Sequence, residues 1–333
     1  MIERPTIYDV ARLAGVSSSM ASRILRGARK KEDALTIQVK QAAATLGYQP
    51  NRMAQSLRST SSRVIGLVIP ELRNPFFSTY VELLSRHALD NNYIVMSLVA
   101  TESDILPVVQ RLAEYRVRAV VSAVPEVTYA MKHVQWDGLL IAVSRQPQNS
   151  DTLYVGMDDF LAGKLLAEHL AEYGHQHVIV FAESSAIPST QPRLDGIHAV
   201  LSPANVMVEI VNAPEAVTVS HVKAVVERAK ATAIIGGTDA IALRLYSALG
   251  QIGLRIPMDI SLASFDGTFA VEDFVPIPLT SVIQPIDRCV KIVMEWITQD
   301  VAHHDLNRIT LIPPHLRLGQ TTRSLAHSET INK

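Results

Sequence analysis

The sequence predicts an α/β protein in which an all-α headpiece precedes a two-lobed domain built on parallel sheets. Three observations support this fold class. The first fifty residues carry three short helical patterns. Beyond residue 63, short apolar runs alternate with helical stretches, which is typical of parallel sheets covered by helices. The chain has 333 residues, 48% of them hydrophobic, and is therefore long enough for two or three folding units.

The headpiece begins with two helices joined by a tight turn. Thr6 and Asp9 have the spacing of a capping box, which opens a helix over residues 7–14. Gly15 suits a turn residue with positive φ. Ser17 can cap a second helix that runs to about Leu25.

A third helical pattern starts at Thr36 and ends at Gly47. Three short helices with a glycine in the first turn predict a helix-turn-helix. The second helix places short hydroxyl side chains and arginines on one face, which suits the major groove of DNA. A small helical bundle with an ordinary polar face is the alternative that this pattern leaves open.

Charge is distributed unevenly along the chain. Residues 1–62 hold ten Lys and Arg against four Asp and Glu, a net charge of +6, which leaves −7 for the rest. This polarity favours a basic module that faces a polyanion, joined to a mildly acidic body. A solvated charged surface fits the charge equally well, so the motifs decide between the two.

The headpiece resembles the signature of the LacI/GalR family of bacterial repressors. The matching stretches are TIYDVARLAGVS at 6–17, ASRIL at 21–25 and LGYQPN at 46–51. The stretch RMAQSL at 52–57 is similar to the hinge helix of that family. The resemblance implies a cytoplasmic transcriptional repressor that binds palindromic operator DNA as a homodimer and responds to a small-molecule effector.

The resemblance also implies the roles of nine DNA-binding residues. Ser18, Ser19 and Arg23 would read bases in the major groove. Leu57 would enter the minor groove as an apolar wedge that kinks the duplex, and Ala54 beside it would let two hinge helices approach. The residues implied to touch phosphates are Thr6, Ser17, Ser22 and Asn51.

The second part of the chain carries the strand and helix patterns. From the resemblance we expect a periplasmic-binding-protein-like pair of lobes, with ligands bound at the carboxyl ends of the strands. We place a DNA-binding domain at 1–50, a hinge and linker at 51–62, the effector and dimerisation domain at 63–322 and a polar tail at 323–333. The first lobe is predicted at about 63–157 and 287–322, and the second at about 158–286.

Seven residues are implied to line the effector cleft. They lie in or beside segments that match family motifs, among them NPFF at 74–77, VGMDD at 155–159 and RLDG at 193–196. The implied residues are Phe76, Phe77, Asp158, Ser189, Arg193, Thr238 and Asp266. Carboxylates with an arginine and an aromatic ring suit a neutral polyhydroxylated ligand.

Two departures from the family pattern narrow the ligand. Thr238 stands where the family usually has Asn, which removes a hydrogen-bond donor. Ile187 stands where the purine-responsive member has Arg, which argues against a purine base. A pentose, a hexose or a related nucleoside remains. Whether the ligand releases DNA or promotes DNA binding stays open.

The sequence lacks the signals of several other classes of protein. No run of about 18 apolar residues predicts a membrane span, and the N-terminus has no apolar signal region, which indicates the cytosol. The single Cys289 excludes an intrachain disulfide. We expect no cofactor, catalytic residue or metal site, and interpret His175, His177 and the pair at 303–304 as surface histidines. A solute-binding protein and a sugar-acting α/β enzyme are the alternatives.

Overall fold

The computed structural model describes residues 5–25, 29, 31–49, 62–147, 152–184, 187–213, 217–268, 277–299 and 308–325. The chain divides into two compact units, Met1–Ser62 and Arg63–Lys333. Each unit is considered by itself below. Within the described ranges, none of the helices combines the length and the hydropathy that a membrane crossing requires.

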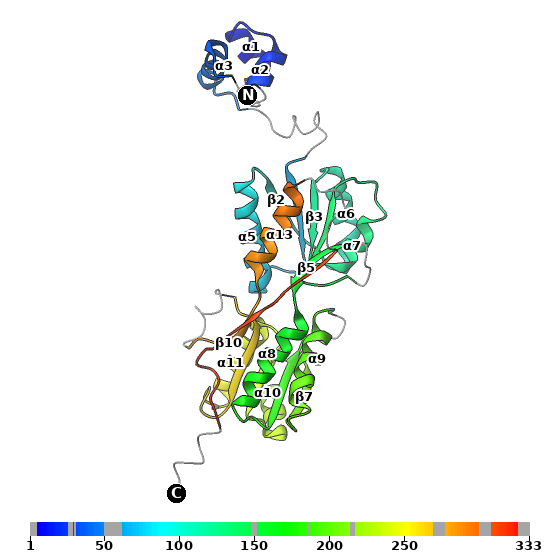
Figure 1. The fold of residues 1–333 in the computed structure, drawn as a ribbon, viewed down its shortest axis with the longest axis vertical. Helices are drawn as coiled ribbons and strands as arrows, with labels where there is room; N and C mark the ends of the chain where they lie inside the picture. Colours follow the sequence, from blue (N-terminus) through cyan, green and yellow to red (C-terminus); the bar gives the residue numbers. More distant parts are fainter. Residues whose placement is uncertain are drawn as a thin grey trace. The chain divides into compact units, whose positions relative to one another are not determined.

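The N-terminal unit consists of three helices around a small apolar core (Figure 1). The Thr6–Asp9 capping box and Gly15, with φ +60°, form as predicted. The third helix begins two residues before the predicted Thr36, because Asp33 caps it by accepting the Thr36 N–H at 3.1 Å. The helices are α1 (Ile7–Leu13), α2 (Ser18–Leu25) and α3 (Ala34–Thr45).

The second unit contains two six-stranded sheets, one in each lobe. Every strand pair is parallel except β10–β12, which confirms the predicted fold class. The first sheet has the order β11 (Ile309–Ile312), β5 (Leu153–Met157), β4 (Leu139–Val143), β3 (Ala119–Ser122), β1 (Val64–Ile69), β2 (Ile94–Val99). The second has the order β12 (His315–Arg317), β10 (Thr280–Ile283), β9 (Ser261–Asp266), β8 (Ala233–Gly236), β6 (His177–Ala182), β7 (Met207–Asn212).

Helices cover both faces of each sheet, so the central strands are buried on both sides (Figure 1). In the first lobe, α5 (Pro75–Asp90) and α13 (Ile286–Thr298) pack on one face, and α6 (Ile105–Glu114) and α7 (Pro125–Met131) on the other, with the short 3-10 helix η1 (Glu102–Asp104) before α6. In the second lobe, α8 (Asp159–Glu172) and α9 (Thr190–Leu201) oppose α10 (Val219–Ala229) and α11 (Asp239–Gln251).

The chain passes between the lobes three times. It enters the second lobe after β5, returns after β10, and crosses again between β11 and β12. The prediction that residues 287–322 belong to the first lobe is therefore wrong for their last part. β12 pairs antiparallel with β10, and Thr321 accepts the backbone N–H of Thr280 at 2.9 Å, so this segment completes the second sheet.

Candidate ligand cleft and DNA-reading helix

The outward face of α2 carries the residues predicted to read bases. Ser19 and Arg23 are exposed and Ser18 is half-buried, whereas Ala21 and Ile24 on the opposite side are buried in the core of the unit. Ser17 caps α2 by accepting the Met20 N–H at 3.2 Å. The side chains predicted to contact DNA thus face away from the interior of this unit.

The remaining predicted DNA contacts divide into two groups. Thr6 lies at the start of α1, where its hydroxyl donates to Asp9 at 2.6 Å, and Ser22 lies half-buried on α2. Asn51, Ala54 and Leu57 lie outside the described residues, as does most of the hinge segment at 51–62. Their roles stay predictions.

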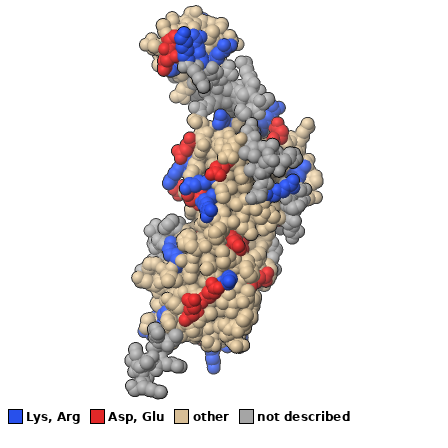
Figure 2. Space-filling view, viewed as in Figure 1, with Lys and Arg blue, Asp and Glu red and all other residues tan. Residues whose placement is uncertain are grey.

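Three of the basic side chains that the structure describes in the N-terminal unit form ion pairs, among them that of Arg12 with Asp9. Arg29 forms an ion pair with Asp33, and Lys40 with Glu32. Figure 2 shows such neighbouring positive and negative side chains on this unit. Arg23 forms no ion pair with any described residue, so its guanidinium is available to an external partner.

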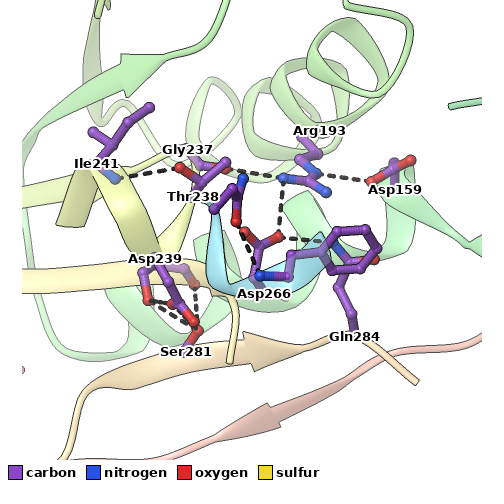
Figure 3. Close-up of polar contacts among 12 residues, drawn as sticks. Asp159, Arg193, Gly237, Thr238, Asp239, Ile241, Asp266, Ser281 and Gln284 are labelled. Carbon is purple, nitrogen blue, oxygen red and sulfur yellow. Dashed lines mark hydrogen bonds and ion pairs between the residues drawn. The ribbon is translucent and has the colours of Figure 1, made fainter. Parts of the chain in front are cut away.

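The second lobe contains a buried arginine at the carboxyl ends of its strands (Figure 3). Arg193 Nε donates to Asp159 Oδ1 at 2.8 Å, and Nη1 donates to the Gly237 carbonyl at 2.9 Å. Nη1 also lies 3.8 Å from Asp266 Oδ1, and the guanidinium lies 4.9 Å from the Phe265 ring centroid. Burial opposes the charge of Arg193, but Asp159 and Asp266 raise its pKa above the ordinary value.

Close packing of α8 against α9 brings Arg193 to Asp159. A Cβ atom at Gly196 would collide with the carbonyl of Phe160, and one at Gly163 would collide with the carbonyl of Arg193. Only glycine permits this approach, so the Arg-x-x-Gly spacing of 193–196 has a packing cause. Burial raises the pKa of Asp159 despite the neighbouring Arg193.

The two acidic residues at the start of α8 have different contacts. The carboxylate of Asp158 caps the helix by accepting the Leu161 N–H at 2.9 Å, whereas that of Asp159 pairs with Arg193. Sequence reasoning singled out Asp158 and missed Asp159. A ligand contact by Asp158 stays a prediction.

Asp239 organises the backbone next to Asp266 (Figure 3). It accepts the Ser264 hydroxyl at 2.8 Å, and the N–H and hydroxyl of Thr268 at 2.7 and 2.9 Å. Burial, followed by the charge of Asp266, raises the pKa of Asp239 to about 6.

Asp266 itself has a φ of +90°, an unfavourable conformation for a residue with a Cβ atom. Its side chain accepts Gln284 Nε2 at 2.7 Å, and burial raises its pKa. Asp239 and Gln284 are site residues that the sequence analysis did not identify. Such strained conformations persist where surrounding contacts hold them, and they gather at functional sites.

The other predicted cleft residues are buried with diverse contacts. Thr238 caps α11 and Ser189 precedes α9, both in the second lobe. Phe76 and Phe77 belong to the core of the first lobe, with ring centroids 5.0 Å apart in an edge-to-face arrangement.

The histidine interpretation was wrong for His175. Its ring is 1% exposed, and Nδ1 lies 2.9 Å from Thr232 Oγ1. Burial, with the nearby charges of His169 and Arg323, lowers its pKa to about 4, so it is a neutral core residue. Residues 303 and 304 lie outside the described ranges. Among the described residues, no group of three or more His, Cys, Asp or Glu is placed to hold a metal ion.

Two family models match the chain. Residues 6–51 match "Bacterial regulatory proteins, lacI family", and residues 167–322 match "Periplasmic binding protein-like domain". The chain is 25% identical to the sucrose operon repressor of Streptococcus mutans over 95% of this chain and 98% of that protein. It is 26% identical to the ribose operon repressor of Escherichia coli over 94% and 96% of the two chains.

Solved structures confirm the fold. A Lac repressor dimer bound to operator and the anti-inducer ONPF matches with a TM-score of 0.84 at 24% identity, over 96% of this chain and 100% of that one. A helix-turn-helix followed by a two-lobed periplasmic-binding domain defines a DNA-binding transcriptional regulator. Residues 6–51 of the chain match the lacI family of bacterial regulatory proteins, the family that the sequence resembles.

Proposed function

We propose that this protein is a cytoplasmic repressor whose affinity for operator DNA is set by a neutral polyhydroxylated ligand in the cleft between its lobes. The observation that carries the proposal is the Arg193 cluster. Asp159, Asp266 and Arg193 offer acceptors and donors together at strand ends, which is where α/β folds bind ligands. Vicinal hydroxyls donate to carboxylates and accept from a guanidinium. Relatives named sucrose and ribose operon repressors support a sugar.

The control of DNA binding follows from linkage. A ligand that favours a closed cleft shifts the lobes between two arrangements, and the hinge segment at 51–62 transmits this shift to the DNA-binding unit. Coupling of about 1–3 kcal/mol is typical of allostery and corresponds to roughly 5- to 150-fold in DNA affinity. We expect the ligand to release the operator, which relieves repression.

A homodimer would account for two features, the recognition of a palindromic operator and an exposed edge strand in the first lobe. Two helix-turn-helix units related by a two-fold axis match a palindromic operator. In the first lobe, β2 is an edge strand, and its Ile94 and Val99 side chains are 57% and 44% exposed. We propose that a second copy covers this edge, which would also remove an aggregation hazard. The Lac repressor of similar fold is a dimer.

The DNA-binding part is tested by selecting duplexes from a random pool with the full-length chain and measuring affinity by fluorescence anisotropy. Arg23→Ala is expected to weaken the selected site by about 1–3 kcal/mol, or roughly 5- to 150-fold, while leaving random duplex almost unchanged. Arg12→Ala, which removes an 80%-exposed arginine from α1, is the matched control. Equal binding of selected and random duplex by the wild type would refute sequence-specific recognition.

The enzyme alternative has a direct test. We infer that the cleft binds its ligand without converting it, because the Arg193 cluster offers binding groups and the relatives are named repressors. Incubating the purified protein with sucrose, cellobiose, glucose and ribose should leave each sugar unchanged by chromatography. Steady conversion of any of these sugars would show that the protein is an enzyme and would contradict the proposed repressor function.

A further inference from the structure

A small cavity lies between α9 and the sheet of the second lobe. Its polar lining consists of Glu183, Thr190, Arg193 and Gly237. The rest of the wall is apolar and is formed by Val180, Ala182, Leu194, Ile197 and Phe265. The centre of a water-sized sphere can occupy about 10 Å³ of this cavity, which is close to the room that one buried water molecule needs.

Thr190 contributes a buried hydroxyl without a partner to this cavity. The residue is 6% exposed, and its Oγ1 makes no hydrogen bond with any described residue. Thr190 is the first residue of α9, one turn before Arg193 on the same helix. Because a buried polar group without a partner is destabilising, nearly all such groups in native proteins bond to protein or to ordered water. The Thr190 hydroxyl therefore indicates an occupant of the cavity.

Two charged groups on the same cavity can each make a further hydrogen bond. Arg193 donates from Nε to Asp159 and from Nη1 to the Gly237 carbonyl, but its Nη2 donates to none of the residues that the structure describes. The carboxylate of Glu183, which follows β6, is partly buried and accepts no hydrogen bond within the described ranges. Burial raises the pKa of Glu183, and the charge of Arg193 opposes this rise most strongly.

The size and the charges of the cavity determine what can occupy it. A sugar ring is far too large for this space. Arg193 disfavours a cation, and Glu183 disfavours an anion, so the occupant is small and neutral. A buried water molecule typically makes two to four hydrogen bonds to polar groups that lack other partners. The hydroxyl of Thr190, the carboxylate of Glu183 and Nη2 of Arg193 are three such groups on one cavity.

We propose that the second lobe binds one ordered water molecule in this cavity, and that the water joins Thr190 and Glu183 to Arg193. The water donates to the Glu183 carboxylate and accepts from the Thr190 hydroxyl and from Arg193 Nη2. Thr190 is thus a positioning residue, because through the water it fixes a guanidinium whose other nitrogens are held by Asp159 and the Gly237 carbonyl. The contact of Arg193 with a ligand rests on the function proposed for the cleft, whereas the water site does not.

Crystal structures of the full-length chain test the water directly. At a resolution that shows ordered waters, density for one water should lie within hydrogen-bonding distance of Thr190 Oγ1 and of Glu183 or Arg193. Thr190→Val, which keeps the shape of threonine without its hydroxyl, should lose this water, and Thr190→Ser should keep it. A wild-type structure without the water overturns the site. A guanidinium of Arg193 that is as well ordered in Thr190→Val as in the wild type overturns the positioning role.

Thermal unfolding tests the same site through the sign of one change. If the water completes the Thr190 hydroxyl, Thr190→Val loses a hydrogen bond and should lower the unfolding temperature by about 2–4 °C. If the hydroxyl has no partner, the same substitution removes an unsatisfied buried group and should raise that temperature. Thr298→Val, at an exposed threonine of α13, is the matched control and should change it little. An unchanged or higher unfolding temperature for Thr190→Val overturns the water site. Because neither experiment contains sugar or DNA, this failure is separate from failure of ligand or operator binding.

Discussion

The two lobes have the same layered architecture but differ in how their charged residues are partnered. The second lobe contributes a connected polar network in which Arg193, Asp266 and Asp239 have several protein partners each. In the first lobe, Phe76 and Phe77 pack into the core, and Arg145 makes no ion pair with any described residue.

This difference indicates that the two lobes have different roles in ligand binding. A network whose members already hold one another is preorganised, so a ligand that binds it loses little ordering entropy. The guanidinium of Arg145 in the first lobe makes no ion pair with any described residue and lies 5.9 Å from the Phe77 ring centroid. The second lobe should therefore set ligand orientation, and the first lobe should respond to occupancy. Four substitutions test this contrast, from the largest expected effect to the smallest.

Arg193→Ala should have the largest effect. It leaves Asp159 and Asp266 buried without their counter-charge, which typically costs about 3–5 kcal/mol of the free energy of unfolding. Urea denaturation measures the loss, and calorimetry should find no sugar binding. Arg255→Ala is the control, because Arg255 pairs with Asp259 at the surface and such pairs contribute about 0–1 kcal/mol. Similar losses for both variants would show that the buried network has no special role.

Asp239→Asn should change how stability depends on pH. The folded-state pKa of Asp239 is raised to about 6 from 3.8, so the folded protein binds more protons than the unfolded chain between these values. The stabilisation is complete below pH 3.8 and is lost as the pH rises to about 6, by roughly 3 kcal/mol. The free energy of unfolding of the wild type minus that of Asp239→Asn should therefore fall from pH 4 to pH 6.5. A constant difference would contradict the raised pKa.

The regular elements were predictable because their signals are local. The alternating apolar runs of the sequence form strands in the structure, for example β4 and β8. Helix α2 followed from Gly15 and Ser17, whose turn and capping preferences act within a few residues. These turn and capping preferences do not depend on distant contacts, so the sequence alone was sufficient to predict the elements.

The parts of the site that sequence reasoning missed depend on distant contacts. Gln284 reaches Asp266 from a neighbouring strand end, a pairing set by the sheet order and not by spacing along the chain. Two adjacent aspartates can each begin α8, and only the packing against α9 decides which one meets Arg193. Strand β12, three residues long, changes sheets after two prolines without a periodic signal.

Phe76→Leu should show that the Phe76 ring stabilises the core of the first lobe. Phe76 is 5% exposed and lies against Phe77, so the smaller side chain leaves a gap and costs about 1–2 kcal/mol. Binding of monosaccharides should change little. Phe160→Leu, at a ring that is 46% exposed, is the matched control from the second lobe. If Phe76→Leu abolished sugar binding at unchanged stability, the ring would be a direct ligand contact instead.

Asp158→Ala should have the smallest effect on stability, and it separates two roles of one carboxylate. Loss of the N-cap of α8 costs about 1 kcal/mol, and Asp158→Ser should restore most of it because a hydroxyl also accepts the Leu161 N–H. Ligand affinity then decides the second role. If Asp158 contacts the ligand, as the family motif implies, Asp158→Ser stays weak in calorimetry although its helix is capped. If affinity returns with the cap, Asp158 only fixes the first turn of α8, and through it the position of Asp159 beside Arg193.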